Sequence, residues 1–398
     1  MTSENQRITP DWTTRQVLAL TEISKDSFDS ILHFAIENNL RDIYIKSGDY
    51  LRARQHQNRL VISKEVLTHS EVKSLLSAAL SSLERTDRGY STNPAYTLTN
   101  RANRADKRNF RLSVNGFSEG GVKGYNCAIR PLPKAPPTIE EIELRKEIAV
   151  RVGGLQQGLV LLIGATGEGK TSTIAAIMRY VLEKIPNKRI LEYSRPVENL
   201  WHNVSIHPSN QIVPHNVSED GVSGDMISYE ESIKTAMRQA GDWIAIGEMT
   251  EAESFEAALE FSNTGHLVSS SVHGNSVSAA YSRVYMKFDV NKRESLMDSL
   301  ISETELMIAQ KLYPRIDRKE GGLVACREML DHTHDVKTRL KAALENSKSP
   351  ISALRNEINQ CMWDQGTTFY QDAERLCREG KIGQETLKLV ERTYGKLK

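Results

Sequence analysis

The stretch that decides the fold of this chain reads Gly164-Ala165-Thr166-Gly167-Glu168-Gly169-Lys170-Thr171. It fills every fixed position of the phosphate-binding pattern G-x-x-x-x-G-K-[ST]. An apolar run over 159–163 precedes it and a helix-forming run over 172–183 follows it. The stretch therefore stands between a predicted strand and a predicted helix, which is the context that the pattern requires and that a chance glycine-rich turn would lack.

The residue types in this stretch suit the binding of ATP and Mg²⁺. Glycines let the backbone curl so that successive N–H groups point at phosphates, and the helix N-terminus adds partial positive charge. Lys170 can reach the β- and γ-phosphates, and the Thr171 hydroxyl can bind Mg²⁺. We therefore expect residues 164–171 together with Ser172 to bind the nucleotide, and Thr171 to bind the metal.

Composition is typical of a cytoplasmic enzyme with more than one domain. The chain has 398 residues, of which 26% are charged and 39% hydrophobic, and this length predicts two or three domains. The formal net charge of +1 provides no overall field to attract nucleic acid, so no direct nucleic acid binding is expected. The four cysteines lack C-x-x-C spacing and suit a reducing compartment. No apolar segment is long enough to span a membrane, so any membrane association is expected to be peripheral.

Changes in pattern along the chain predict five regions. They are a flexible arm over 1–27, an α+β domain over 28–130, a proline-rich linker over 131–137, an ATPase domain over 138–330 and a helical region over 331–398. In the first domain, helices are expected from Phe28 and over 72–83. Strands are expected over 41–45, 51–61, 108–117 and 124–130, the last two joined at Gly120-Gly121. The linker has four prolines in seven residues, which favours an extended, semi-rigid chain.

The ATPase domain alternates helical patterns with continuous apolar strands. The predicted strands are Leu159–Ile163, Arg189–Tyr193, Trp243–Ile246, His266–Val272 and Leu323–Met329. Continuous apolar runs of this kind indicate a mostly parallel sheet with helices on both faces. The strand over 243–246 is followed by Gly247 and Glu248. Ligands of open α/β sheets bind at the carboxyl ends of strands, so Glu248 is a candidate to orient water or Mg²⁺, the alternative being an acid in solvent.

Four blocks of sequence resemble, in order, motifs of the PilT/GspE superfamily of secretion and pilus ATPases. The blocks are Gly164–Thr173 (phosphate loop), Ser194–Glu198 (acidic box), Ile246–Met249 (second nucleotide motif) and Thr264–His273 (histidine box). Shorter matches extend the resemblance over residues 28–330. The resemblance implies an α/β fold with a RecA-like P-loop core, an N-terminal α+β domain of PAS-like type and a helical C-terminal tail. It also implies a homo-hexamer that works with inner-membrane secretion or transfer components.

The resemblance also implies roles for single residues. Glu248 and Glu198 are the expected catalytic acids, and His273 is expected to sense the γ-phosphate or to couple subunits. Arg111 and Arg130 stand where the family's N-terminal domain presents arginines to the nucleotide, where a cation can stabilise the transferring phosphoryl group. For each of these side chains an ordinary structural role is the alternative.

Departures from the family pattern indicate a branch. Ser194 and Arg195 stand where two acids are usual, which leaves Glu198 as the acid of that box. The Ala-Ile-Arg-Asn motif of pilus-retraction members is not evident near 337–347, and the four-cysteine module of assembly-type members is absent. The pattern is most similar to the type IVB secretion and conjugal transfer ATPases of the DotB and TraJ kind.

Other functions stay open from the sequence. A pilus retraction ATPase is the nearest alternative, followed by a DNA-directed ATPase, a nucleotide-binding scaffold and a small-molecule kinase. The histidines also raise the question of a metal site. His266 and His273 are seven residues apart, and an odd separation on one continuous strand places two side chains on opposite faces. One strand is therefore not expected to offer both imidazoles to a single ion.

Overall fold

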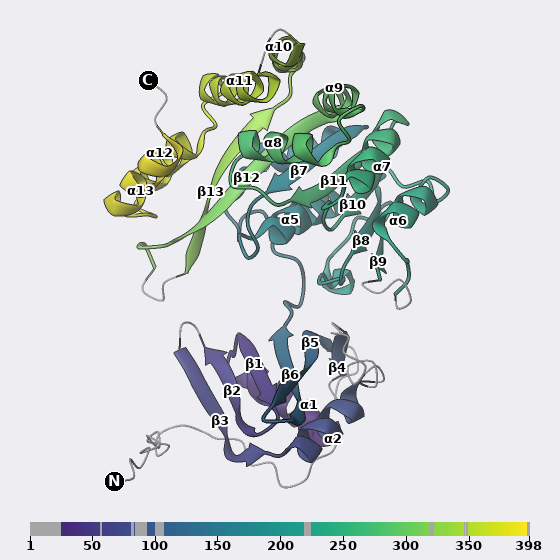
Figure 1. The fold of residues 1–398 in the computed structure, drawn as a ribbon, viewed down its shortest axis with the longest axis vertical. Helices are drawn as coiled ribbons and strands as arrows, with labels where there is room; N and C mark the ends of the chain where they lie inside the picture. The colour runs from purple at the N-terminus through teal and green to yellow at the C-terminus, as the bar shows by residue number, and fades with distance from the viewer. Residues whose placement is uncertain are drawn as a thin grey trace. The chain divides into compact units, whose positions relative to one another are not determined.

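The computed structural model describes residues 25–55, 58–80, 83, 94–99, 107–218, 224–318, 322–345, 347 and 349–395. The arm predicted over residues 1–27 lies outside the described residues as far as residue 24. The chain divides into two compact units, Met1–Lys134 and Ala135–Lys398, which are described separately (Figure 1).

The first unit is built on a six-stranded sheet in the order β3-β2-β1-β6-β5-β4, and all of its neighbouring strands are antiparallel. The strands are β1 (Asp42–Lys46), β2 (Asp49–Gln55), β3 (Asn58–Leu67), β4 (Ala95–Thr99), β5 (Lys107–Glu119) and β6 (Val122–Pro131). Along β5, buried Phe110, Leu112 and Val114 alternate with more exposed residues, so one face of the sheet is apolar. The helices α1 (Lys25–Glu37) and α2 (His69–Ala79) pack their apolar sides on this face.

The second unit is built on a seven-stranded sheet in the order β13-β12-β7-β11-β10-β8-β9. The strands are β7 (Gly158–Ile163), β8 (Arg189–Ser194), β9 (Gln211–Asn216), β10 (Trp243–Ile246), β11 (Leu267–Val272), β12 (Thr304–Pro314) and β13 (Leu323–Asp331). Every neighbouring pair is parallel except β12 and β13. The prediction of a mostly parallel sheet is therefore confirmed. The edge strand β9 was not predicted because its half-exposed residues form no apolar run.

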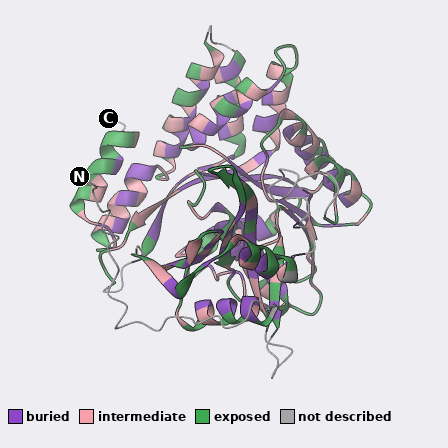
Figure 2. Ribbon diagram, turned by 60° about the horizontal axis from the view of Figure 1, so that its bottom comes forward, coloured by how far each residue is buried: buried purple, intermediate pink, exposed green. Residues whose placement is uncertain are grey.

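Helices cover both faces of this sheet, which explains why all six residues of β7 are buried. One apolar layer lies against α4 (Lys146–Gly154) and α5 (Lys170–Lys184). The other lies against α6 (Tyr229–Ala236), α7 (Ala252–Asn263), α8 (Val277–Lys287) and α9 (Arg293–Glu303). Between β8 and β9 the chain makes the short 3-10 helix η1 (Trp201–Asn203). Figure 2 shows the buried residues gathered along the strands and on the inner sides of the helices.

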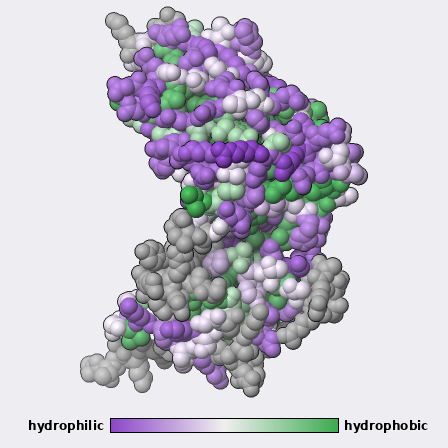
Figure 3. All heavy atoms as spheres, turned by 90° about the vertical axis from the view of Figure 1, so that its right-hand side faces the viewer, coloured by the Kyte–Doolittle hydropathy of each residue, from purple (hydrophilic) through white to green (hydrophobic). Residues whose placement is uncertain are grey.

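The end of the chain is helical, with α10 (His334–Glu345), α11 (Pro350–Asp364), α12 (Phe369–Arg378) and α13 (Gln384–Tyr394). Leu340, Ile358 and Leu376 continue the apolar layer of α6–α9, so these helices belong to the second unit. On the face drawn in Figure 3, hydrophilic residues cover much of the coloured surface. None of the helices formed by the described residues has the length and apolar character that crossing a bilayer requires.

Candidate nucleotide site

The phosphate loop connects the end of β7 to the start of α5, as the sequence predicted. Gly167 has φ +87° and Gly169 has φ +79°, a left-handed conformation that glycine adopts at little cost. Gly169 is also the residue before the first turn of α5, and a Cβ there would lie 2.9 Å from Gln310 Nε2. Ala165 and Thr166 are exposed. The loop therefore leaves β7, presents its middle to solvent and lies close to Gln310 of β12 where α5 begins.

Lys170 is held by the loop itself. Its Nζ donates to the carbonyl oxygens of Gly164 at 2.9 Å and Ala165 at 3.0 Å. An ammonium group has three N–H donors, so one remains for a ligand. Burial lowers the pKa of Lys170, while the negative charges of Glu248 and Glu168 act in the opposite direction. Lys170 is thus a nearly enclosed cation, and the negative charges of Glu248 and Glu168 favour its protonated form.

Three adjacent parallel strands bring the predicted site residues together. In the order β7-β11-β10, the carboxyl ends are followed by the phosphate loop, His273 and Glu248. His273 Nε2 lies 2.6 Å from Glu248 Oε1, although 25 residues separate them in the chain. Ser271 Oγ donates to Gly247 O at 2.7 Å and Met249 N donates to Ser271 O at 3.0 Å, so β11 fixes the backbone on both sides of Glu248.

The start of α5 completes this edge of the sheet. Thr171 and Ser172 are exposed in its first turn, beside the buried Lys170. N–H groups in the first turn of a helix lack intrahelical acceptors and carry partial positive charge. The arrangement can therefore hold an anion with backbone donors, one ammonium donor and two hydroxyl groups.

The region of the acidic box contains a second acid besides Glu198. Glu198 lies after β8 and is half-buried. A second acid, Glu192 on β8, is only 2% exposed and accepts hydrogen bonds from Trp201 Nε1 at 2.6 Å, Asn199 Nδ2 at 3.1 Å and Ser194 Oγ at 3.2 Å. Burial raises the pKa of Glu192, and the charge of Glu198 raises it further. Sequence reasoning missed Glu192, although an acid inside an apolar strand is itself a signal.

Arg111 and Arg130 lie in the first unit. They are directly opposite each other on β5 and β6. Arg130 Nε donates to Oδ1 of the buried Asp42 at 2.7 Å. The structure thus brings the two arginines together and gives Arg130 a fixed carboxylate partner.

The histidines of the fourth block stand at the two ends of one strand. His266 precedes β11 and its ring packs against Phe261, with 4.2 Å between ring centres, whereas His273 follows β11. Among the described residues, no group of three or more His, Cys, Asp or Glu side chains is arranged to hold a metal ion. His273 instead contacts the carboxylate of Glu248.

Comparisons with known proteins agree with this architecture. The family model described as "Type II/IV secretion system protein" matches residues 124–386. The type IV pilus ATPase PilU of Pseudomonas aeruginosa is 25% identical over 364 residues, covering 87% of this chain and 87% of that protein.

Solved structures resemble nearly the whole chain. The ATPase DotB of Legionella pneumophila matches with a TM-score of 0.76 and 25% identity, covering 95% of this chain and 100% of that one. The pilus retraction motor PilT, solved with bound ADP, matches with a TM-score of 0.74 and 23% identity, covering 91% and 96%. These matches confirm the predicted α/β fold class and the predicted superfamily. The chain belongs to the type II/IV secretion system protein family and is an ATPase.

Proposed function

We propose that this chain is a hexameric ATP-hydrolysing motor that powers a type IVB secretion or conjugative transfer apparatus at the cytoplasmic face of the inner membrane. The observation that carries the proposal is the meeting of Lys170, Glu248 and His273 at the ends of three adjacent strands. The similarity to DotB over nearly the whole chain supports the choice of system.

In this proposal the loop residues bind the phosphates of ATP. Backbone N–H groups of 164–169 and the first turn of α5 donate to phosphate oxygens. The free N–H of Lys170 adds a charged donor, and phosphate oxygens can replace the carbonyls of Gly164 and Ala165 as acceptors for the other two. The lysine is already near its place before ATP binds, so little side-chain freedom is lost on binding.

Glu248 and His273 are proposed to act on the attacking water. One carboxylate oxygen of Glu248 contacts His273, which leaves the other to accept a hydrogen bond from water and to hold its proton. His273 fixes the orientation of the carboxylate and can report the presence of the γ-phosphate. Glu198 is proposed as a second acid after the end of β8, where its charge acts on Glu192.

The residues at the start of α5 fit Mg²⁺ as well. Thr171 offers an exposed hydroxyl, and the charge of Glu248 is near enough to affect Lys170. Hydroxyl and carboxylate oxygens are hard ligands of the kind that Mg²⁺ takes together with phosphate oxygens and water. We propose that Thr171 binds Mg²⁺, which when bound neutralises charge on the phosphates.

Arg111 and Arg130 are proposed to reach the nucleotide from the first unit, of the same or a neighbouring subunit. A guanidinium group there would stabilise the charge that spreads over the transferring phosphoryl group. The segment 131–137 joins the two units, and its prolines would transmit motion rather than absorb it. Partners are proposed to be inner-membrane components of the apparatus, with peripheral association and no direct contact to nucleic acid.

Pilus retraction is the second candidate, favoured by the similarity to PilU and PilT. A genetic experiment separates the two candidates. The gene is deleted in its host, and secretion or conjugal transfer is compared with twitching motility, using the wild-type gene and Lys170→Ala for complementation. Loss of transfer with intact twitching is expected, restored by the wild type alone. Loss of twitching alone would assign the chain to retraction.

The ring is tested with purified full-length protein. ATP hydrolysis per subunit should rise with protein concentration as larger assemblies appear in sedimentation velocity experiments. Arg111→Ala and Arg130→Ala should still bind ATP and hydrolyse it slowly. Full activity from a species that sediments as a monomer at every concentration would refute the hexamer. Wild-type turnover in Arg111→Ala and Arg130→Ala would refute the arginine assignment.

A further inference from the structure

Gln310 on β12 joins the phosphate loop to the neighbouring strand. Only 2% of this residue is exposed, and each end of its amide is used. Its Nε2 donates to Glu168 O at 2.5 Å, and its Oε1 accepts from Thr173 Oγ1 at 2.8 Å and from Arg327 Nε at 2.8 Å. One buried amide thus contacts the loop, the first turns of α5 and β13 at once.

The loop is held by β12 at a second point. Glu168 Oε2 accepts from Leu312 N at 2.5 Å, so Glu168 is fixed through both its carbonyl and its carboxylate. Gly169 lies so close to Gln310 that it has no room for a side chain. The conformation of the loop before Lys170 therefore depends on β12 as well as on β7.

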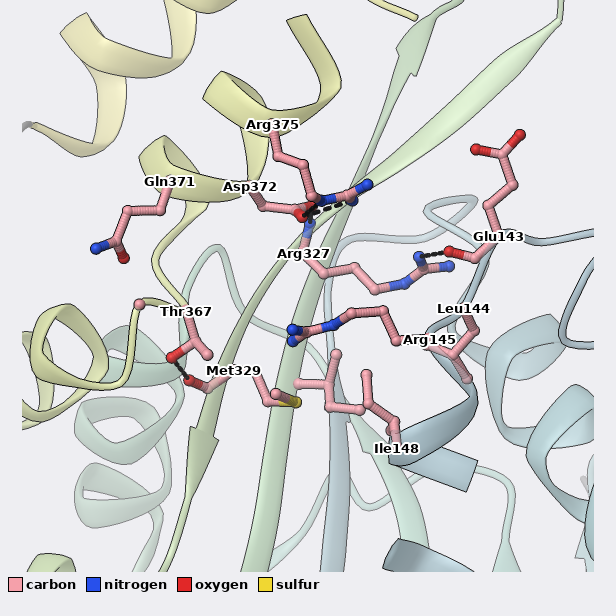
Figure 4. A pocket seen from close by; sticks show the side chains of 12 residues that line it. Glu143, Leu144, Arg145, Ile148, Arg327, Met329, Thr367, Gln371, Asp372 and Arg375 are labelled. Atoms are coloured by element: carbon pink, nitrogen blue, oxygen red, sulfur yellow. Dashed lines mark hydrogen bonds and ion pairs between the residues drawn. The ribbon is translucent and has the colours of Figure 1, made fainter. Parts of the chain in front are cut away.

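Arg327 extends the connection beyond the sheet. Besides its bond to Gln310, its guanidinium donates to the carbonyl oxygens of Glu143 at 3.3 Å and Ile142 at 3.0 Å. Its backbone N donates to Asp372 Oδ2 on α12 at 2.9 Å. Figure 4 shows the Arg327 side chain running from β13 toward the chain at Glu143, with Asp372 and Arg375 beside its start. These guanidinium donors meet neutral amide and carbonyl oxygens, so the group bridges β13, β12 and the chain at 142–143.

The segment that Arg327 reaches is the first part of the second unit. Lys134 ends the first unit, and the chain then runs through 135–145 to α4. Thr138 and Glu141 close a turn there, with Thr138 N donating to Glu141 Oε2 at 2.7 Å and Glu141 N donating to Thr138 Oγ1 at 3.1 Å. The carboxylate of Glu143 contacts Arg315 Nη1 at 2.5 Å and Lys381 Nζ at 2.8 Å. This entry segment, residues 138–145, is therefore held by Arg327 on β13, by Arg315 directly after β12 and by Lys381 between α12 and α13.

We propose that Gln310 and Arg327 are positioning residues that fix the phosphate loop and couple it to the entry segment through which the first unit is joined. The inference rests on the proposed binding of ATP at the loop. When phosphates occupy the loop, the backbone at Glu168 is held in place, and the chain of hydrogen bonds through Gln310 and Arg327 holds the carbonyls of the entry segment in turn. The occupied loop thereby acts on the part of the chain that leads to the other unit.

The test uses the full-length protein and two substitutions, each of which removes a different hydrogen bond from the series that runs through Gln310 and Arg327. Gln310→Glu keeps an acceptor for Arg327 and Thr173 but places a carboxylate oxygen against Glu168 O. Arg327→Met keeps most of the side-chain length and removes every guanidinium donor. Arg151→Met is the matched control, because Arg151 on α4 pairs with Asp331 and Glu305 rather than with the loop. ADP affinity, kcat, KM and amide hydrogen exchange with and without ADP are measured for each.

Gln310→Glu is expected to weaken ADP binding and raise KM about tenfold, which corresponds to the loss of one buried hydrogen bond and its replacement by repulsion. Arg327→Met is expected to keep ADP affinity within about threefold of the wild type. The substitution removes the hydrogen bond from Arg327 to Gln310 but leaves the hydrogen bond from Gln310 to Glu168 of the loop in place. In the wild type, ADP should slow amide exchange in both 164–173 and 138–145. In Arg327→Met it should slow exchange in 164–173 alone, and Arg151→Met should behave like the wild type.

The outcomes separate this inference from the proposed function. A wild-type chain that neither binds ADP nor hydrolyses ATP would refute the proposed function. If the wild type turns over normally, two results would refute the coupling alone. One is a Gln310→Glu variant whose KM equals that of the wild type, and the other is an Arg327→Met variant in which ADP still slows exchange over 138–145. If Arg327→Met does not fold, Arg327→Lys serves instead, because a lysine can reach one of the two carbonyls and should give a partial loss of the ADP effect.

Discussion

Replacing Glu248 by Gln removes one negative charge from the nucleotide site without changing the size of the side chain. The wild-type carboxylate lies 2.6 Å from His273 Nε2 and its charge raises the pKa of Lys170. If Glu248 orients and deprotonates the attacking water, turnover should fall about 10²-fold or more, equivalent to ~2.7 kcal/mol of transition-state stabilisation. ATP should still bind, because Lys170 and the loop remain.

The loss of turnover should not come from unfolding. About a third of each side chain of the Glu248–His273 pair is exposed, so solvent screens the pair and its contribution to stability is at most about 1 kcal/mol. The backbone at Gly247 and Met249 is held by Ser271 whatever the side chain at 248. The melting temperature of the variant should therefore stay within a few degrees of the wild-type value.

The same substitution changes the pH dependence of binding in a defined direction. ATP requires the protonated form of Lys170, so affinity is lost as the pH rises through the pKa of that lysine. Burial already lowers this pKa, and Glu248 opposes the effect. In Glu248→Gln the opposing charge is gone, the pKa falls further, and the loss of ATP affinity should begin at a lower pH than in the wild type.

The assay measures phosphate release and the binding of a fluorescent ATP analogue across a pH series, for the wild type and for three variants. Lys170→Ala should lose binding and turnover together, since its charge contacts ground state and transition state alike. Glu251→Gln is the control, because this acid lies three residues after Glu248 and its side chain is 73% exposed. Equal loss of ATP binding in Glu248→Gln and Lys170→Ala, or wild-type turnover in Glu248→Gln, would refute a role for Glu248 as the base.

Three other substitutions test the acidic box, a buried acid and the core. Glu198→Gln should lower kcat with a modest effect on ATP affinity in steady-state assays, and unchanged turnover would leave Glu198 a structural acid. Burial raises the pKa of Glu328 on β13 to about 7, above its value in the unfolded chain, so its contribution to stability is present at low pH and lost as the pH rises toward 7. In urea unfolding, the free energy of unfolding of Glu328→Gln should rise by on the order of 3 kcal/mol relative to that of the wild type between pH 4.5 and 7.5. A difference between the two proteins that stays constant over this range would contradict the raised pKa. Leu161→Ala in the middle of β7 should destabilise the second unit by about 2–5 kcal/mol, measured by the same method, and a loss under 1 kcal/mol would contradict close packing there.

Features that depend only on neighbours in the chain could be predicted from the sequence. The phosphate loop is contiguous, and its glycines, lysine and threonine specify a backbone conformation over eight residues. The strands β7, β8, β10 and β11 were predicted within a residue at each end, because strands buried on both faces are rich in apolar residues, although β11 also buries Ser269, Ser270 and Ser271. The hairpin of β5 and β6 was predicted from its alternating pattern and its Gly120-Gly121 turn.

Strands with weaker local patterns were harder to predict. β9 has Pro214 and His215 in a half-exposed edge strand, and its sequence resembles a loop. Leu51 to Val61 was predicted as one or two strands, and the structure has β2 ending at Gln55 and β3 beginning at Asn58. These are positions at which pairing with a neighbouring strand, and not the segment itself, stabilises the extended conformation.

Which side chains meet depends on the packing of the strands and helices. Glu248 and His273 follow different strands, and only the order β11-β10 makes them neighbours. Gln310 reaches Glu168 across 142 residues of sequence, and Arg327 reaches Ile142 across 185. Such pairs have no fixed spacing in the chain, because sheet order and helix packing set their distances. The local sequence therefore specifies the phosphate loop. The residues that contact the loop are set by the order of the strands in the sheet, and no single segment of the sequence encodes that order.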